Sequence, residues 1–135
     1  MRVVRWQDIK EPFRGESGEV IYEMIGAPSP IGGTTHHNFV HVVIPPGKSS
    51  QAHYHRRAEE TYYVLSGVGR MILDGREFNL TAGQACLIMP GQVHQIFNDQ
   101  SFDLTFNAVS APAWTPSDWF EAGAQEWKTV GKAEH

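Results

Sequence analysis

The chain has 135 residues, of which 41% are apolar and 19% are charged, and its net charge is −4. This length allows one sizeable core, so we expect a single domain over residues 1–135, and the composition argues against a disordered chain. The negative charge provides no basic field to attract nucleic acid, and no stretch approaches the roughly 18 apolar residues of a membrane-spanning helix, so neither partner is expected.

The cysteine content and the N-terminus bear on the compartment. Cys86 is the single cysteine of the sequence and can form no internal disulfide. The first residues, MRVVRWQDIK, lack the apolar region of a secretory signal peptide. We therefore expect a cytoplasmic protein in which Cys86 is a small core residue.

Short runs of strand-forming residues recur between turn signals, and helical periodicity is nearly absent before the C-terminus. The predicted strands cover residues 20–25, 39–44, 61–65, 70–73, 77–80, 85–89, 94–98 and 104–110. An Asp-Gly pair in LDGRE (73–77) predicts a tight type I′ hairpin, and hairpins imply antiparallel pairing. The pattern predicts an all-β sandwich or small barrel.

The C-terminal tail has a different pattern. In WTPSDWFEAGAQEW (114–127), Thr115 is suited to an N-cap, Pro116 to the first helical position, and Asp118 to the first turn. The tail therefore predicts a short closing helix.

Residues 51–67, QAHYHRRAEETYYVLSG, gather ligand-type side chains just before a predicted strand. In extended backbone, residues two apart face the same way, so His53 and His55 can aim their imidazoles at one point. A turn over RRAE would bring a glutamate opposite them across a hairpin. His94, which begins a different predicted strand, is the candidate for a fourth ligand.

These residues resemble the two motifs of the cupin superfamily, specifically its small single-domain members. The first motif is matched by Gly47, His53, His55, Glu60 and Gly67, and the second by Gly83, Gly91, His94 and Asn98. The proline usual in the second motif falls on Met89, with Pro90 beside it. The motif core covers residues 47–98.

The resemblance implies an antiparallel two-sheet jelly-roll barrel. It also implies one divalent transition metal per chain, held by His53, His55, Glu60 and His94. Three imidazoles and one carboxylate suit Fe, Mn, Ni, Co, Cu or Zn and do not suit an all-oxygen calcium or magnesium site. The alternative is a metal-free barrel whose histidines line a ligand pocket.

The choice between Glu59 and Glu60 depends on the motif glycine. Six residues separate Glu60 from Gly67, as the motif requires, whereas Glu59 would need a glycine at position 66, which is serine. If Glu60 points inward, strand alternation makes Tyr62 a cavity residue near the metal.

Other residues are weaker candidates. His41 lies on a predicted strand that leads towards the first motif, and it is either a pocket residue or an ordinary strand histidine. Asn98 is a candidate to support a metal ligand. His36 and His37 follow a glycine-rich loop without a partner at metal-ligand spacing, so we expect them to be exposed to solvent.

Three function classes fit these observations. The first is a metal-dependent enzyme acting on a small oxygenated organic substrate, with dioxygenase chemistry first and decarboxylase, lyase or isomerase chemistry next. The second is a non-catalytic module that binds a small ligand. The third is an isomerase-like pocket without metal, which the intact ligand set disfavours.

We also expect a homodimer. An isolated two-sheet barrel leaves edge strands, and cupins that resemble this chain usually pair through their sheets. The predicted strand at residues 20–25 is suited to covering such an edge.

Overall fold

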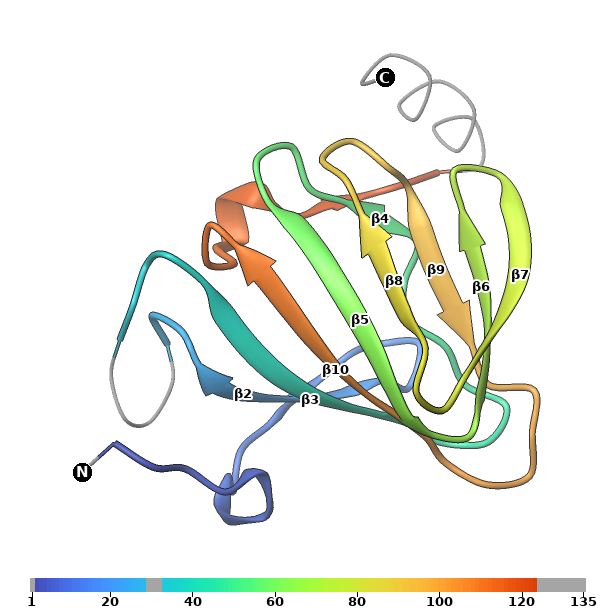
Figure 1. Ribbon diagram of the computed structural model, residues 1–135, viewed down its shortest axis with the longest axis horizontal. Helices are drawn as coiled ribbons and strands as arrows, with labels where there is room; N and C mark the ends of the chain where they lie inside the picture. The colour runs from blue at the N-terminus through green and yellow to red at the C-terminus, as the bar shows by residue number, and fades with distance from the viewer. Residues whose placement is uncertain (1, 29–32, 124–135) are drawn as a thin grey trace.

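The computed structural model describes residues 2–28 and 33–123, which form two antiparallel sheets (Figure 1). The six-stranded sheet has the order β1-β2-β3-β10-β5-β8, and the five-stranded sheet has the order β11-β4-β9-β6-β7. The strands are β1 (Phe13–Arg14), β2 (Val20–Ile25), β3 (Asn38–Ile44), β4 (His53–Tyr54), β5 (Glu59–Ser66), β6 (Val68–Leu73), β7 (Arg76–Thr81), β8 (Ala85–Ile88), β9 (His94–Phe97), β10 (Leu104–Ala111) and β11 (Phe120–Glu121). This is the predicted jelly-roll architecture.

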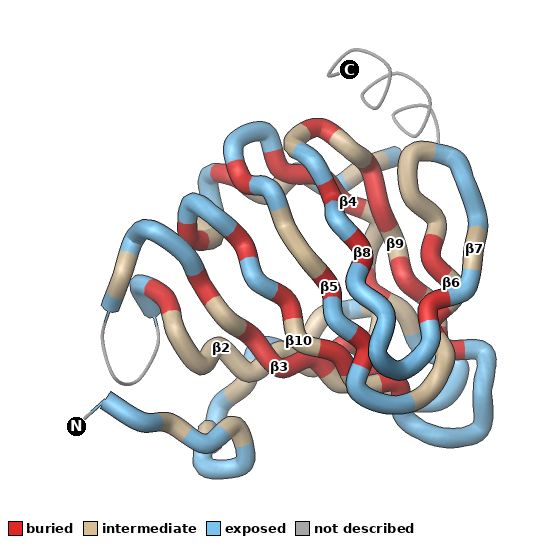
Figure 2. The backbone as a smooth tube through the Cα atoms, in the orientation of Figure 1, coloured by how far each residue is buried: buried red, intermediate tan, exposed pale blue. Residues whose placement is uncertain are grey.

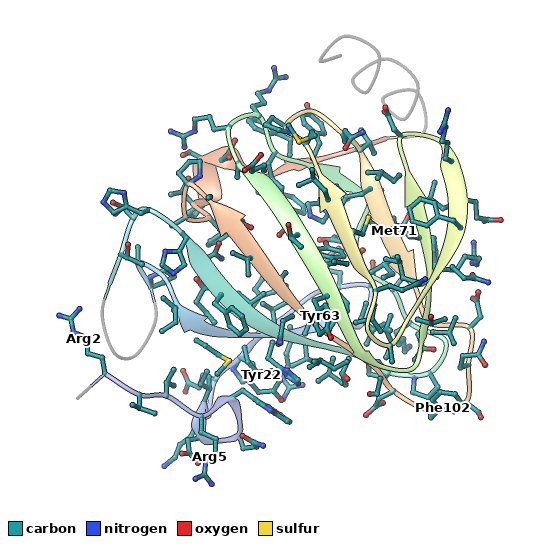
Figure 3. All side chains as sticks on the ribbon, viewed as in Figure 1. Arg2, Arg5, Tyr22, Tyr63, Met71 and Phe102 are labelled. Atoms are coloured by element: carbon teal, nitrogen blue, oxygen red, sulfur yellow. The ribbon has the colours of Figure 1, made fainter. Side chains whose placement is uncertain are left out.

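The strands form because apolar side chains alternate with polar or exposed ones at the period of a β-strand. Burial alternates along β8 and β10, as Figure 2 shows. The inward side chains of both sheets share one core cluster, to which β6 contributes Met71 (labelled in Figure 3). Cys86 belongs to this cluster, as expected, and burial raises the pKa of its thiol.

The predicted β6–β7 hairpin is confirmed. Leu73 pairs with Arg76, which leaves Asp74 and Gly75 as a two-residue loop. Their φ angles are 55° and 81°, and a type I′ turn requires positive φ at both positions. The Asp-Gly pair therefore specifies this turn through the backbone conformations that these residues tolerate.

The strand predictions agree closely with the structure where a strand is long. β2 has the predicted bounds, and the other long strands differ from the predictions by one or two residues at an end. β1, β4 and β11 lie outside the predicted strand ranges, because a strand of two residues is too short to show a period.

The predicted C-terminal helix is only partly present. Thr115 and Pro116 do begin a helical turn, but this is a single turn of 3-10 helix, η2 (Pro116–Asp118), and Thr115 makes no side-chain cap. At Trp119 the backbone is extended and leads into β11, which pairs with β4. Tertiary pairing thus overrides the local helix signal. The rest of the predicted tail lies outside the described residues, and within the described ranges no helix is long and apolar enough to cross a membrane.

Candidate metal centre

The structure brings together the four side chains that the sequence predicts as metal ligands. The candidate ligands are His53, His55, Glu60 and His94, and each offers one donor atom, these atoms lying within 4.8 Å of one another. Two donors about 2.1 Å from one ion, on opposite sides of it, would be about 4.2 Å apart, so the spacing fits a shared ion after a small contraction. The donor set of three nitrogens and one oxygen suits a transition metal.

The two sheets supply the ligands from opposite sides. His53 and His94 are cross-strand partners on β4 and β9 of the five-stranded sheet, and His55 directly follows β4. Glu60 comes from β5 of the six-stranded sheet. The predicted hairpin between the histidines and the glutamate is therefore wrong, because the turn after His55 carries the chain from one sheet to the other.

A backbone carbonyl orients each imidazole. The Nδ1 atoms of His53, His55 and His94 lie 2.8, 2.7 and 2.9 Å from the carbonyl oxygens of residues 51, 118 and 92, respectively. Because a carbonyl oxygen can only accept, Nδ1 carries the hydrogen in each ring. The lone pair is then left on Nε2, the nitrogen that is free to bind a metal.

The donor atoms that face one another are buried and unpaired. Oε1 of Glu60 lies 3.6 Å from Nε2 of His55 and 3.4 Å from Nε2 of His94. These three atoms have no hydrogen-bond partner within the described part of the chain. Buried polar atoms without a partner are costly, and a cation bound between them would remove that cost.

The electrostatics of the site favour a charged carboxylate. Burial alone would raise the pKa of Glu60, but the neighbouring imidazoles of His55 and His94 outweigh this effect and hold the pKa well below its ordinary value. Burial would lower the pKa of His55, but the neighbouring Glu60 carboxylate outweighs this effect and raises the pKa. Burial, together with the neighbouring histidines, lowers the pKa of His53 well below its ordinary value. A cation entering this site would therefore compete with protonation of the His55 ring.

Strand β5 places the two neighbouring glutamates on opposite faces. Glu59 is exposed, whereas the Glu60 side chain is 11% exposed and faces the site. Tyr62 follows on the inner face and is buried, with its ring edge-on to His94 at 5.9 Å between centroids. Burial raises the pKa of Tyr62 well above its ordinary value, so the phenol keeps its proton.

His41 does not line the cavity, so its assignment as a pocket residue is wrong. Its neighbours Val40 and Val42 on β3 belong to the core cluster, and alternation directs His41 to the outer face of the six-stranded sheet. There its ring stacks on Trp6 of η1 (Trp6–Asp8), with centroids 4.3 Å apart. The side chain is buried because this N-terminal turn covers it.

Asn98 does not support a metal ligand, contrary to expectation. Its Nδ2 donates to the carbonyl oxygens of Ile44 and Phe102, both at 2.8 Å, and its Oδ1 accepts the N–H of Gln100. These bonds join two loops at the end of β9 opposite to His94. His36 and His37 are exposed, as expected.

Sequence reasoning missed the residues that hold the candidate ligands in place. Ser110 on β10 donates its hydroxyl hydrogen to Oε2 of Glu60 at 2.9 Å. Trp119 stacks against the ring of His53, with centroids 5.7 Å apart. Both contacts join segments far apart in the chain, and no local pattern marks them.

Two further acidic side chains were also missed. Glu19 and Glu23 stand two positions before and two positions after Ile21, which packs against the core. Burial raises the pKa of each carboxyl group to about 7. The upward shift is opposed at Glu19 by a hydrogen bond from the backbone of Gln51, and at Glu23 by a hydrogen bond from the Asn38 side chain. The sequence signal was available, because in extended backbone Glu19 and Glu23, each two positions from Ile21, lie on the same face as Ile21.

Comparisons with known proteins agree with this architecture. A model of the cupin domain family matches residues 40–111. An oxalate-binding protein of Thermotoga maritima is 37% identical over 71 residues, which are 53% of this chain and 59% of that relative. The match thus spans little more than half of the relative.

Two solved structures share the fold. An uncharacterized conserved protein with a double-stranded β-helix domain from Klebsiella pneumoniae has a TM-score of 0.72 at 23% identity, covering 91% of this chain and 98% of that one. A predicted oxalate decarboxylase from Thermotoga maritima has a TM-score of 0.70 at 28% identity, covering 82% of this chain and 98% of that one. Because the family model spans more than half of the sequence, the chain belongs to the cupin domain family.

Proposed function

We propose that this cupin is a metal-dependent enzyme acting on a small oxygenated organic substrate that chelates the metal. The observation that carries the proposal is the group of buried, unpaired donor atoms on His55, Glu60 and His94, with His53 beside them. Dioxygenase chemistry is the first candidate reaction, and decarboxylase, lyase and isomerase chemistry follow it. The cofactor is one divalent transition metal per chain, chosen from Fe, Mn, Ni, Co, Cu and Zn.

The residues of the site have separate tasks in this proposal. The four candidate ligands would hold the metal, which would supply Lewis-acid or redox chemistry to a bound substrate. Tyr62 lies beside His94 with a protonated phenol, so it is suited to donate a hydrogen bond to an anionic oxygen of the substrate. The surrounding apolar core limits the access of water.

The relatives define a first substrate class to test. An oxalate-binding relative and a predicted oxalate decarboxylase support small dicarboxylates, which chelate a metal through two oxygens. The name of the first relative also supports the second candidate function, a non-catalytic module that holds a small ligand on its metal.

Metal analysis and turnover assays test this proposal in order. The metal content of the purified protein comes first, and we expect about one transition metal ion per chain. Turnover is then measured with oxalate-like acids, catechols, flavonols and sulfur acids under air and under argon, with Glu60→Gln as the inactive control. Product that requires both metal and oxygen supports a dioxygenase, and product under argon supports the other reactions. Ligand binding without product supports the binding module, and a metal-free protein contradicts both.

We also propose that residues 1–135 act as one domain in a cytoplasmic homodimer. The outer face of the six-stranded sheet exposes apolar side chains on adjacent strands, including Tyr63 on β5, Leu87 on β8 and Val109 on β10. A second copy of the chain would bury this face in a symmetric contact.

Sedimentation equilibrium at micromolar concentration tests the dimer. We expect a dimer for the wild type and a weakened dimer for Leu87→Lys. The matched control is Phe102→Lys, because Phe102 is equally exposed but lies in the loop before β10 (Figure 3). A monomeric wild type would contradict the proposal.

A further inference from the structure

The segment over residues 115–122, which we call the C-terminal strap, runs along the part of the chain that carries two candidate ligands. Its strand β11 pairs with β4, so that Glu121 lies opposite His53 and Phe120 opposite Tyr54. The strap continues past the pairing, where the N–H of Ala122 donates to the carbonyl of Ala52 at 2.9 Å. Residues 120–122 of the strap are therefore held against the segment that carries His53.

The carboxylate of Asp118 organises the turn between His55 and Glu60. Oδ1 accepts the backbone N–H groups of Arg56 and Arg57 at 2.8 and 3.0 Å, and Oδ2 accepts that of Ala58 at 3.0 Å. Asp118 is 3% exposed, so these bonds are shielded from water. Hydrogen bonds to an ionised acceptor are stronger than neutral ones, and three of them hold successive residues of one turn.

The backbone carbonyl of the same residue orients the imidazole of His55. The carbonyl oxygen of Asp118 accepts the hydrogen of Nδ1 of His55 at 2.7 Å. Asp118 thus contacts both the ring of His55 and the turn that follows it. His53 and His94 differ, because each binds the carbonyl two residues before it and needs no distant segment.

We propose that Asp118 is a positioning residue of the metal centre, because its side chain locks the turn after His55 and thereby fixes the carbonyl that orients this ring. The inference rests on the proposed metal centre and adds to it a dependence on the C-terminal strap. A substitution of Asp118 keeps its backbone carbonyl but removes the side-chain bonds to the turn. The distance between this carbonyl oxygen and Nδ1 of His55 is then no longer fixed. His55 then samples both tautomers, and metal affinity falls.

A purely structural role for Asp118 predicts different behaviour. General loosening of the barrel would disturb all three histidines together. Loss of positioning would disturb His55 alone, because His53 and His94 keep their local carbonyl partners. The tautomers of the three rings, read from ¹⁵N chemical shifts of the metal-free protein, separate these two cases.

The experiment uses the 135-residue chain with Asp118→Ala, Asp118→Asn and the control Glu121→Ala, which removes an exposed carboxylate from the same strap. Co²⁺ affinity is measured by titration against a competing chelator. We expect Asp118→Ala to weaken Co²⁺ binding by about 10- to 100-fold, the usual effect of losing a residue that supports a metal ligand. Asp118→Asn keeps one acceptor oxygen, so its Co²⁺ affinity is expected to lie between those of the wild type and Asp118→Ala. Glu121→Ala is expected to bind Co²⁺ as the wild type does.

Each outcome bears on one of the two proposals. Wild-type Co²⁺ affinity in folded Asp118→Ala, or an unchanged His55 tautomer, overturns the inference and leaves the metal centre standing. If Asp118→Ala does not fold, the Co²⁺ affinity and the His55 tautomer are measured in Asp118→Asn, and the same results overturn the inference. Disturbance of all three histidines also contradicts a positioning role. A wild-type protein that binds no Co²⁺ contradicts the metal centre itself and the inference with it.

Discussion

Ser110 and Glu60 are cross-strand partners on β10 and β5, and the Ser110 hydroxyl donates to Oε2 of Glu60 at 2.9 Å. This bond occupies one carboxylate oxygen and leaves Oε1 facing the imidazoles of His55 and His94. The hydroxyl thus selects which oxygen is presented to the candidate metal.

We expect Ser110→Ala to weaken metal binding by about tenfold, because the carboxylate loses the bond that orients it. The measurement is Co²⁺ affinity in the metal-depleted protein. Ser66→Ala is the matched control, since Ser66 bonds Thr105 at 2.7 Å across the same two strands, on the exposed surface. Equal affinities in the two variants would show that Ser110 does not orient the ligand.

Metal occupancy should fall as the solution becomes acidic. A ligand imidazole must be neutral, and Glu60 raises the pKa of His55 above 6.5. Protons therefore begin to compete for His55 at a pH above 6.5, and occupancy declines as pH falls through that region. Metal content after dialysis at successive pH values checks this. Full occupancy retained down to about pH 4 would argue against a site of three histidines.

Glu23→Gln should stabilise the protein in alkaline solution. Burial raises the pKa of Glu23 from 4.5 to about 7, so the folded state holds this proton more tightly than the unfolded state. The resulting stability is complete below pH 4.5 and is lost as pH rises through about 7. A shift of this size corresponds to at most about 3 kcal/mol, and partial solvent contact reduces it.

Denaturant unfolding of the two proteins at several pH values tests this expectation. The gain in free energy of unfolding for Glu23→Gln should be near zero in acid and about 1 to 3 kcal/mol in alkali. Glu16→Gln, at an exposed position before β2, is the control and should change little at any pH. A gain that does not depend on pH would mean that the Glu23 charge is not the cause.

The fold could be predicted from the sequence wherever a signal lies within one segment. Runs of strand-forming residues located β2 and β10, and the Asp-Gly pair located a hairpin turn, because both signals depend on neighbouring residues. The pairing of β11 with β4 could not be predicted, since it joins two-residue strands from distant parts of the chain. The same pairing explains why the helix signal at Thr115 yields only one turn.

The candidate site shows the same division. The spacing of the histidines, glutamate and glycines predicted which four side chains meet. The spacing did not predict that these side chains come from two different sheets. The same short sequence can form a hairpin turn within one sheet or a connection between two sheets. The supporting contacts of Ser110 and Asp118 arise only after folding, and His41 was misplaced because η1 buries it from the outside.

The metal content of two neighbouring glutamate variants tests most directly whether three histidines and Glu60 hold a metal. Glu60 faces the imidazoles, whereas Glu59 is exposed on the other face of β5. Wild type, Glu60→Gln and Glu59→Gln are dialysed identically, their folding is checked by circular dichroism, and metal per chain is determined. We expect Glu60→Gln to lose most of its metal, because an anionic ligand is removed, and Glu59→Gln to keep the wild-type content. Retention of metal by Glu60→Gln, with loss from Glu59→Gln, would contradict the register of β5 and the metal centre built on it.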